Sequence, residues 1–205
     1  MTASSPSLAA DERAALADLL DELGPDAPTC CGGWTTAHLA AHLVVRERRP
    51  GALAGFGLEE AGLGGAIAAW SHRIEDRLRA SAPYAEVVAR LRSGPRPWAP
   101  LAWPVLARVF NTAEFAIHHE DVRRAQLDWT VRALPRAAQD ELWGPASVYA
   151  RRAATRLGRG LVIRRSDVPG VEKRIGSGAV TVEGEPMELL LWAAGRRDVA
   201  RVQIA

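Results

Sequence analysis

One stripe of ionisable side chains, set in an apolar segment, constrains this chain more than any other feature. Between positions 104 and 126 apolar residues recur with helical spacing, and Glu114, His118 and Asp121 stand among them. At about 100° per residue the three fall within a sector of about 60°, on one helix face. A carboxylate, an imidazole and a second carboxylate therefore form a polar stripe along an otherwise apolar helix.

A second predicted helix carries histidines with the same spacing. His38 and His42 are four residues apart, and Arg46 continues their face. A Glu-x-x-x-His pair that faces a histidine on another helix is a standard way to build a metal site in a helical bundle. Two imidazoles and one carboxylate suit zinc or another first-row divalent metal, and three protein ligands leave a position open, as in catalytic sites. We predict that His42, Glu114 and His118 bind the metal.

Each of these features also has a plainer interpretation. A Glu-His pair four residues apart is common on solvated helices, and His38 fits a solvent-exposed residue better than a third ligand or a group behind the ligands. The arginines between 46 and 49 are equally compatible with a solvated helix end. Cys30 and Cys31 precede a helix start, where thiolates are stabilised, but we favour small-residue packing over nucleophilic catalysis.

The rest of the first 157 residues predicts further helices, separated by Gly and Pro. Apolar spacing, caps and breakers predict helices over 7–23, 35–49, 67–78, 84–91, 104–126 and 134–157. A kink or a break is expected at Gly144-Pro145. The Gly-rich stretch 51–65 has the composition of a flexible lid, and residues 93–98 are expected to form a loop.

The pattern of the sequence changes from long helices to short strands after Gly158. Residues 161–163, 179–182 and 201–204 read as short strands, and 186–194 as a helix with proline in its first turn. The chain is therefore predicted to be α+β, with a helical metal-binding domain over 1–157 and a small α/β domain over 158–205.

Composition narrows the class of protein. The chain has 205 residues, 48% of them hydrophobic and 24% charged, with a formal net charge of +2, which favours neither nucleic acid nor an anionic membrane as a partner. Its two cysteines are adjacent, so a disulfide framework is excluded. We see neither a signal peptide nor an apolar run long enough to span a bilayer, and we expect a cytoplasmic protein.

Two motifs resemble those of a known family. Residues 33–43, Gly-Trp-Thr-Thr-Ala-His-Leu-Ala-Ala-His-Leu, are similar to the Trp-Thr…Leu-x-x-His-Leu signature of the DinB-like superfamily. Residues 114–121 resemble the Glu-x-x-x-His-His-x-Asp stretch of its mycothiol-dependent maleylpyruvate isomerase family, and 184–196 resemble that family's small C-terminal domain. The segments 46–50 and 111–113 resemble a distinct subgroup of uncharacterised metal-binding proteins.

The resemblance implies a fold and a set of roles. It implies an N-terminal four-helix bundle, zinc on His42, Glu114 and His118, and Arg196 at a position involved in substrate handling. We expect a thiol-dependent transferase or isomerase in which a small thiol such as mycothiol takes the open metal position and attacks a small electrophile. In this scheme Asp121 orients His118 or the metal-bound group, and Arg46 and Arg196 anchor carboxylates.

Two other functions remain compatible with the sequence. One is a metal-dependent hydrolase with water in the open position, for which Asp121 is the candidate general base. The other is a non-catalytic binding or stress protein whose ion stabilises the helices, for which His38 or Asp121 is the candidate fourth ligand.

Overall fold

A computed structural model describes residues 7–48, 65–95, 111–177 and 180–205. Contacts within the chain divide it into two compact units, residues 1–108 with 118–129 and residues 109–117 with 130–205, so that helix α7 (Thr112–Arg123) contributes to both. The predicted 51–65 lid and the predicted helix before residue 111 fall largely outside the described residues. In the part described, no helix is both long and apolar enough to cross a bilayer.

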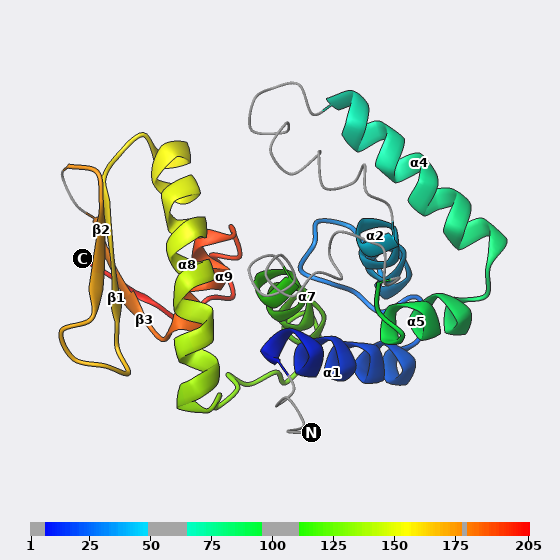
Figure 1. Ribbon diagram of the computed structural model, residues 1–205, viewed down its shortest axis with the longest axis horizontal. Coiled ribbons are helices and arrows are strands. Elements are labelled where there is room, and N and C mark those ends of the chain that lie inside the picture. The colour runs from blue at the N-terminus through cyan, green and yellow to red at the C-terminus, as the bar shows by residue number, and fades with distance from the viewer. Residues whose placement is uncertain (1–6, 49–64, 96–110, 178–179) are drawn as a thin grey trace, which may run out of the picture. The chain divides into compact units, whose positions relative to one another are not determined.

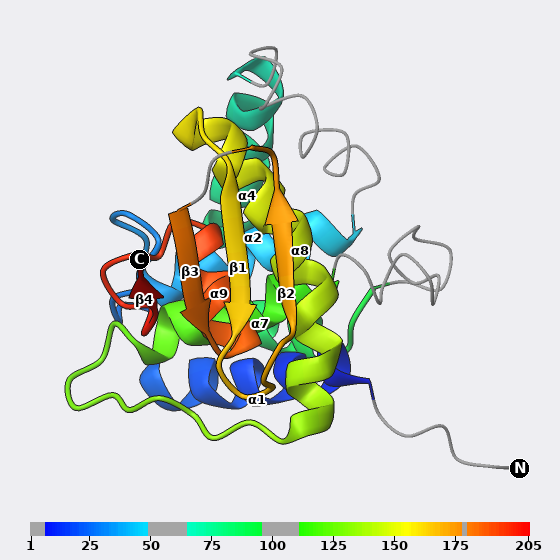
Figure 2. The same cartoon turned by 90° about the vertical axis from the view of Figure 1, so that its left-hand side faces the viewer.

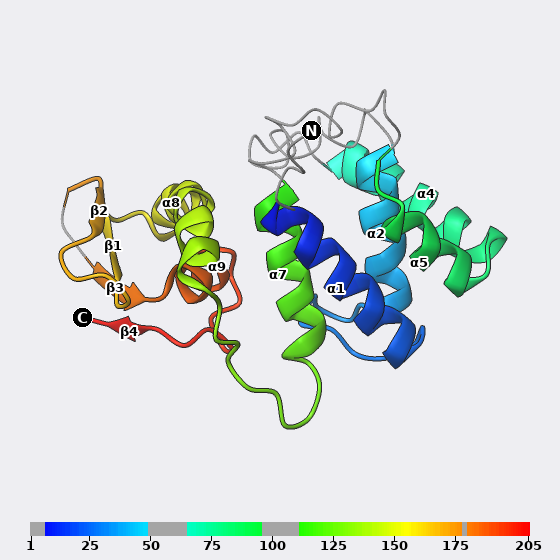
Figure 3. The ribbon, with the colours of Figure 1, turned by 60° about the horizontal axis from the view of Figure 1, so that its bottom comes forward.

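The first unit is helical (Figures 1 and 3). It contains α1 (Leu8–Leu23), α2 (Thr36–Arg48), α4 (Gly65–Ser81), α5 (Tyr84–Arg92) and the C-terminal half of α7. Helix α2 packs against α4 and α5, and α5 packs against α1. The Ser7 side chain caps α1 by accepting a hydrogen bond from the amide of Ala10, and Gly24, with φ of 75°, ends it. The bounds of α1, α2, α4 and α5 match the predicted helices to within a few residues, whereas the four-helix bundle stays a prediction.

Leucines form the core of this unit. Their spacing in the sequence places them on the inner faces of the helices, and the largest fully buried ones are Leu16, Leu20, Leu39, Leu43 and Leu91. The Tyr84 hydroxyl donates to the carbonyl of Leu20 over 2.9 Å and so ties the start of α5 to α1.

The second unit combines a small sheet with two helices (Figure 2). Helix α8 (Arg136–Leu157) is followed by β1 (Leu161–Arg165), β2 (Glu172–Ile175), β3 (Val180–Gly184), α9 (Pro186–Ala193) and β4 (Gln203–Ile204). The strand order is β2-β1-β3-β4, with β1 parallel to β3 and the other pairs antiparallel. Helices α8 and α9 lie on one face of the sheet and pack on each other. The α+β class is confirmed.

Two details of this unit differ from the sequence prediction. Helix α8 runs through Pro145 without a break. Residues on both sides of Pro145, Leu142 and Ala146 among them, are buried, and the packing of α8 on α9 and the sheet stabilises the helix. Strand β2 was not predicted, because Glu172-Lys173-Arg174 has the charge of a loop. It is an edge strand, where such residues protect against unwanted pairing. Since α8 packs with the sheet, the contacts of this unit begin before Gly158, and the domain boundary stays a prediction.

Candidate metal centre

Helix α2 presents His42 toward α7. Thr35 precedes the first turn of α2, and its carbonyl accepts a hydrogen bond from the amide of Leu39. His42 is half-buried, and its ring lies 5.1 Å from that of Trp34 and 5.7 Å from that of His118, centroid to centroid. Trp34 therefore forms one wall beside His42.

Helix α7 supplies the predicted stripe. Glu114, His118 and Asp121 lie on consecutive turns and are all buried, with 4%, 8% and 1% of their surfaces exposed. Burial of a carboxylate or an imidazole in an apolar setting is costly unless the group is paired or bound to an ion. The stripe is therefore an inner face of the molecule rather than a solvated one.

The three residues predicted as metal ligands have donor atoms close together. One ring nitrogen each of His42 and His118 and a carboxylate oxygen of Glu114 all lie within 4.8 Å of one another. Two neutral imidazoles and one carboxylate are the donor set of many catalytic zinc sites, so the residues present fit such an ion.

A carboxylate that sequence reasoning missed lies behind His42. Glu75 on α4 places Oε1 3.0 Å from Nδ1 of His42 and Oε2 3.1 Å from Nδ1 of His72. Burial raises the pKa of Glu75, but hydrogen bonds and charge from His42 and His72 outweigh it and leave the pKa below its ordinary value. An ionised carboxylate at Nδ1 fixes the tautomer of His42 and directs Nε2 away from α4.

Asp121 has the same relation to His118. Its Oδ2 lies 2.9 Å from Nδ1 of His118, and the Asp121 side chain is fully buried. Both imidazoles thus have a carboxylate at Nδ1, which makes Nε2 the nitrogen through which each would reach an ion shared with Glu114. Asp121 lies on the Nδ1 side of the ring, so its carboxylate is not one of the donor atoms that converge with those of His42 and Glu114.

His38 belongs to a separate hydrogen-bonded group. Its Nε2 lies 2.7 Å from Nη1 of Arg79 and accepts from it, and its Nδ1 lies 3.0 Å from the Thr35 hydroxyl. Burial and then the charge of Arg79 lower the pKa of His38. Because both ring nitrogens of His38 are hydrogen-bonded, His38 belongs to neither group of potential metal ligands in the described part of the chain. Its side chain is half-buried, so the interpretation of His38 as a solvent-exposed residue is wrong.

The arginines at the end of α2 are not a solvated helix end. Arg46, one turn after His42, is only 3% exposed. Arg48 reaches the end of α5, where Nη2 donates to the carbonyl of Arg90 and to the Ser93 hydroxyl, both over 2.8 Å. Arg49 lies outside the described residues. In the other unit Arg196 is half-buried, and its Nη1 donates to the carbonyl of Ala194 over 2.9 Å.

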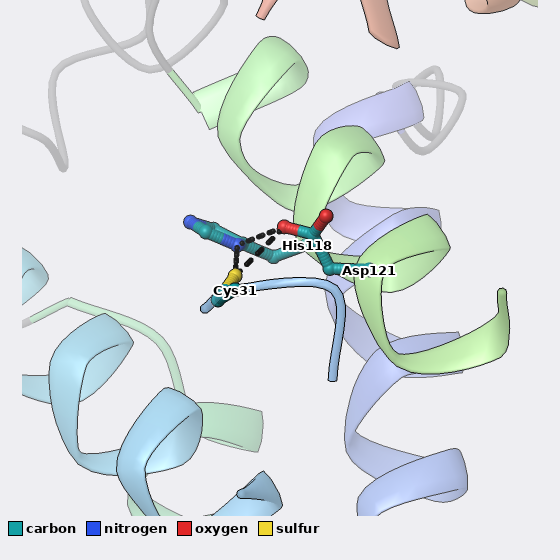
Figure 4. Close-up of side chains that lie close together, drawn as sticks. All are labelled: Cys31, His118 and Asp121. Atoms are coloured by element: carbon teal, nitrogen blue, oxygen red, sulfur yellow. Dashed lines mark hydrogen bonds and ion pairs between the residues drawn. The ribbon is translucent and has the colours of Figure 1, made fainter. Parts of the chain in front are cut away.

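Cys31 is a second residue that sequence reasoning did not place at this site (Figure 4). Its Sγ lies 3.0 Å from Oδ2 of Asp121 and 3.6 Å from Nδ1 of His118. These three residues form a second group of potential metal ligands, distinct from the first but sharing His118. The adjacent cysteines had suggested packing, and only the fold shows that one of them meets an imidazole and a carboxylate.

Comparisons with known proteins give one distant match. No family model matches the chain, and neither does any curated protein. Among solved structures it is similar to a crystal structure of the mycothiol-dependent maleylpyruvate isomerase, with 18% identity over 97% of this chain and 89% of that one, at a TM-score of 0.46. A match at this level does not establish membership of a family.

Proposed function

We propose that the chain is a zinc-dependent enzyme, a transferase or isomerase that uses a small thiol such as mycothiol as cosubstrate for a small electrophile. The observation that carries the proposal is the convergence of donor atoms from His42, Glu114 and His118 within 4.8 Å. When bound, zinc lowers the pKa of a coordinated thiol and holds it as the thiolate. The motif resemblance of residues 33–43 and 114–121 points to the same chemistry.

The surrounding residues have defined tasks in this proposal. Glu75 and Asp121 each face an Nδ1 atom, at 3.0 and 2.9 Å, and so hold His42 and His118 in the tautomer that presents Nε2. Three protein donors leave one coordination position for a small ligand. Arg46 is proposed to attract an acidic group of the thiol or substrate, and Arg196 to bind a carboxylate.

The position of Asp121 weighs against the two competing functions. A hydrolase needs a general base near the water in the open position, and a closed structural site needs a fourth protein ligand. The Asp121 carboxylate faces His118 Nδ1 and the thiol of Cys31, on the other side of the imidazole from Nε2. His38 is likewise occupied by Arg79 and Thr35.

Metal analysis tests the ligand set. Purified protein is expected to contain stoichiometric zinc, and the double variant His42→Ala/His118→Ala to have lost it. His38→Ala, one turn earlier on the same helix, is the matched control and should keep the ion. Zinc at the wild-type level in the double variant would contradict the site.

Calorimetry tests whether a thiol binds to the metal. Mycothiol should bind saturably to the zinc-loaded protein and not after chelation, and binding should release a proton that is detected in buffers of different ionisation enthalpy. Binding that is unchanged after metal removal, or no binding at all, would refute thiol dependence and leave a structural ion as the explanation.

A further inference from the structure

We propose that Cys31, His118 and Asp121 form a second cation site, for a thiophilic divalent ion, on the Nδ1 side of the His118 ring. The site is separate from the one that the proposed function uses. The two share one imidazole but take different nitrogens of it. The donors are one sulfur, one nitrogen and one oxygen, and the sulfur selects soft or borderline ions such as Cd²⁺, Co²⁺ and Zn²⁺ over Mg²⁺ or Ca²⁺.

The distances between donor atoms suit tetrahedral coordination. Sγ lies 3.6 Å from Nδ1 and 3.0 Å from Oδ2, and Nδ1 lies 2.9 Å from Oδ2. Ordinary zinc bond lengths in a tetrahedron separate sulfur from nitrogen or oxygen by about 3.6 Å, and nitrogen from oxygen by about 3.4 Å. The sulfur–nitrogen distance already agrees, and the Asp121 carboxylate has to move by about 0.5 Å. On binding, the thiol proton of Cys31 passes to solvent and the sulfur becomes the ligand.

The cysteine is held in place by its own loop. Residues 28–35 close on themselves through a bridge between Pro28 and Thr35, and the amide of Cys31 donates to the Thr29 hydroxyl over 3.2 Å. The amide of Trp34 donates to the carbonyl of Cys31 over 2.8 Å across a turn that has Gly33 at φ of 80°. A positive φ at the third residue of such a turn favours glycine.

The same loop is joined to helix α7. The amide of Cys30 donates to the carbonyl of Asp121 over 2.9 Å, and the Gln126 side chain donates to the carbonyl of Pro28 over 3.0 Å. The sulfur is therefore brought to His118 and Asp121 by hydrogen bonds that do not depend on an ion. Cys31 is half-buried, which leaves an approach from solvent.

The geometry does not suit a cysteine nucleophile with a His-Asp partner. In such a triad the sulfur and the carboxylate contact opposite nitrogens of the ring. Here both lie at Nδ1, at 3.6 and 2.9 Å, so that the imidazole cannot take a proton from sulfur while the carboxylate orients it. Convergence on one nitrogen is what a shared cation requires.

Use of one ring by two sites has a measurable consequence. A neutral imidazole offers a lone pair on one nitrogen only, so that an ion at Nδ1 leaves the proton on Nε2. Filling the second site should therefore weaken the first. We expect excess Cd²⁺ to displace zinc from the wild type, and to displace it less readily from Cys31→Ser.

Cobalt spectroscopy separates the two sites. Co²⁺ bound through sulfur gives a thiolate-to-metal charge-transfer band in the near ultraviolet, which a site of two imidazoles and a carboxylate lacks. The wild type titrated with Co²⁺ should develop the band, and Cys31→Ser should lose it completely. Cys30→Ser, the adjacent cysteine, should keep it. His42→Ala, which removes only the first site, should keep it too.

Alkylation gives a readout that is independent of the spectrum. Cd²⁺ should protect Cys31, and not Cys30, from iodoacetamide, as mapped by mass spectrometry on the folded protein. The proposal is overturned if the saturated wild type shows no thiolate band, if the band persists in Cys31→Ser, or if Cd²⁺ leaves the alkylation of Cys31 unchanged. Loss of zinc from the double variant His42→Ala/Cys31→Ser, with the band retained in His42→Ala, would support both sites, whereas zinc retained in that double variant would refute only the first.

Discussion

The carboxylate of Glu75 on α4 lies 3.0 Å from Nδ1 of His42 on α2. Helices α2 and α4 pack on each other, and Glu75 is 7% exposed. Glu75 is therefore placed to fix the ring of a proposed metal ligand from behind, at a distance in sequence that no local motif reveals.

Glu75→Gln should weaken zinc binding without unfolding the protein. The amide keeps the shape of the carboxylate but loses its charge, and loss of such a partner costs about 10–100-fold in metal affinity. Competition with a chromophoric chelator measures the affinity. Asp76→Asn is the control, because Asp76 is exposed on the same helix and pairs with Arg79. Equal affinities for the wild type and Glu75→Gln would show that Glu75 does not support the site.

His38 should make stability depend on pH. Because burial and the charge of Arg79 lower its pKa from 6.5, between the lowered pKa and 6.5 the unfolded chain holds a proton that the folded one does not. The contribution of His38 is therefore complete above pH 6.5 and is lost as the pH falls through the lowered pKa. Across this range the midpoint temperature of thermal unfolding of the metal-free protein should rise more steeply with pH for the wild type than for His38→Gln. Parallel plots of this temperature against pH would contradict the role given to His38.

Glu47 should act in the opposite direction. Burial raises its pKa above 4.5, and the Arg13 ion pair only partly offsets this. The folded state then holds the proton more tightly than the unfolded state does. The contribution of Glu47 to the free energy of unfolding is therefore complete below pH 4.5 and is lost as the pH rises through the raised pKa. The difference in unfolding free energy between the wild type and Glu47→Gln should fall with rising pH in this window. A difference that is flat or rises would contradict the assignment.

Gln139 should stabilise the second unit against unfolding. It is buried in α8, where Nε2 donates to the Glu185 carboxylate over 2.6 Å and Oε1 accepts from the amide of Met187 over 3.1 Å. Gln139→Ala leaves the start of α9 without these partners, at a cost of about 2 kcal/mol. Urea unfolding measures the loss, and Gln203→Ala in the exposed strand β4 should change it little. A loss no larger than that of the control would contradict this role.

Sequence patterns identified what is local. The spacing of Glu114 and His118 depends only on the period of one helix, and the glycine and proline signals between the predicted helices depend on a few neighbouring residues. Glu75 could not be identified, because a glutamate in an amphipathic helix has the pattern of a solvated one until its neighbour is known. Strand β2 was missed for a related reason, since pairing with β1 rather than its own residues makes it a strand.

The contact between Cys31 and Asp121 spans 90 residues of chain. A ribosome adds about 5–20 residues per second, so the thiol emerges on the order of 5–20 seconds before the carboxylate that it meets in the folded protein. During that interval the Cys30-Cys31 pair is part of a nascent chain and has no α7 beside it. The period in which this cysteine is most open to oxidants and stray metal ions therefore belongs to synthesis, and its length is set by translation rather than by the folded structure.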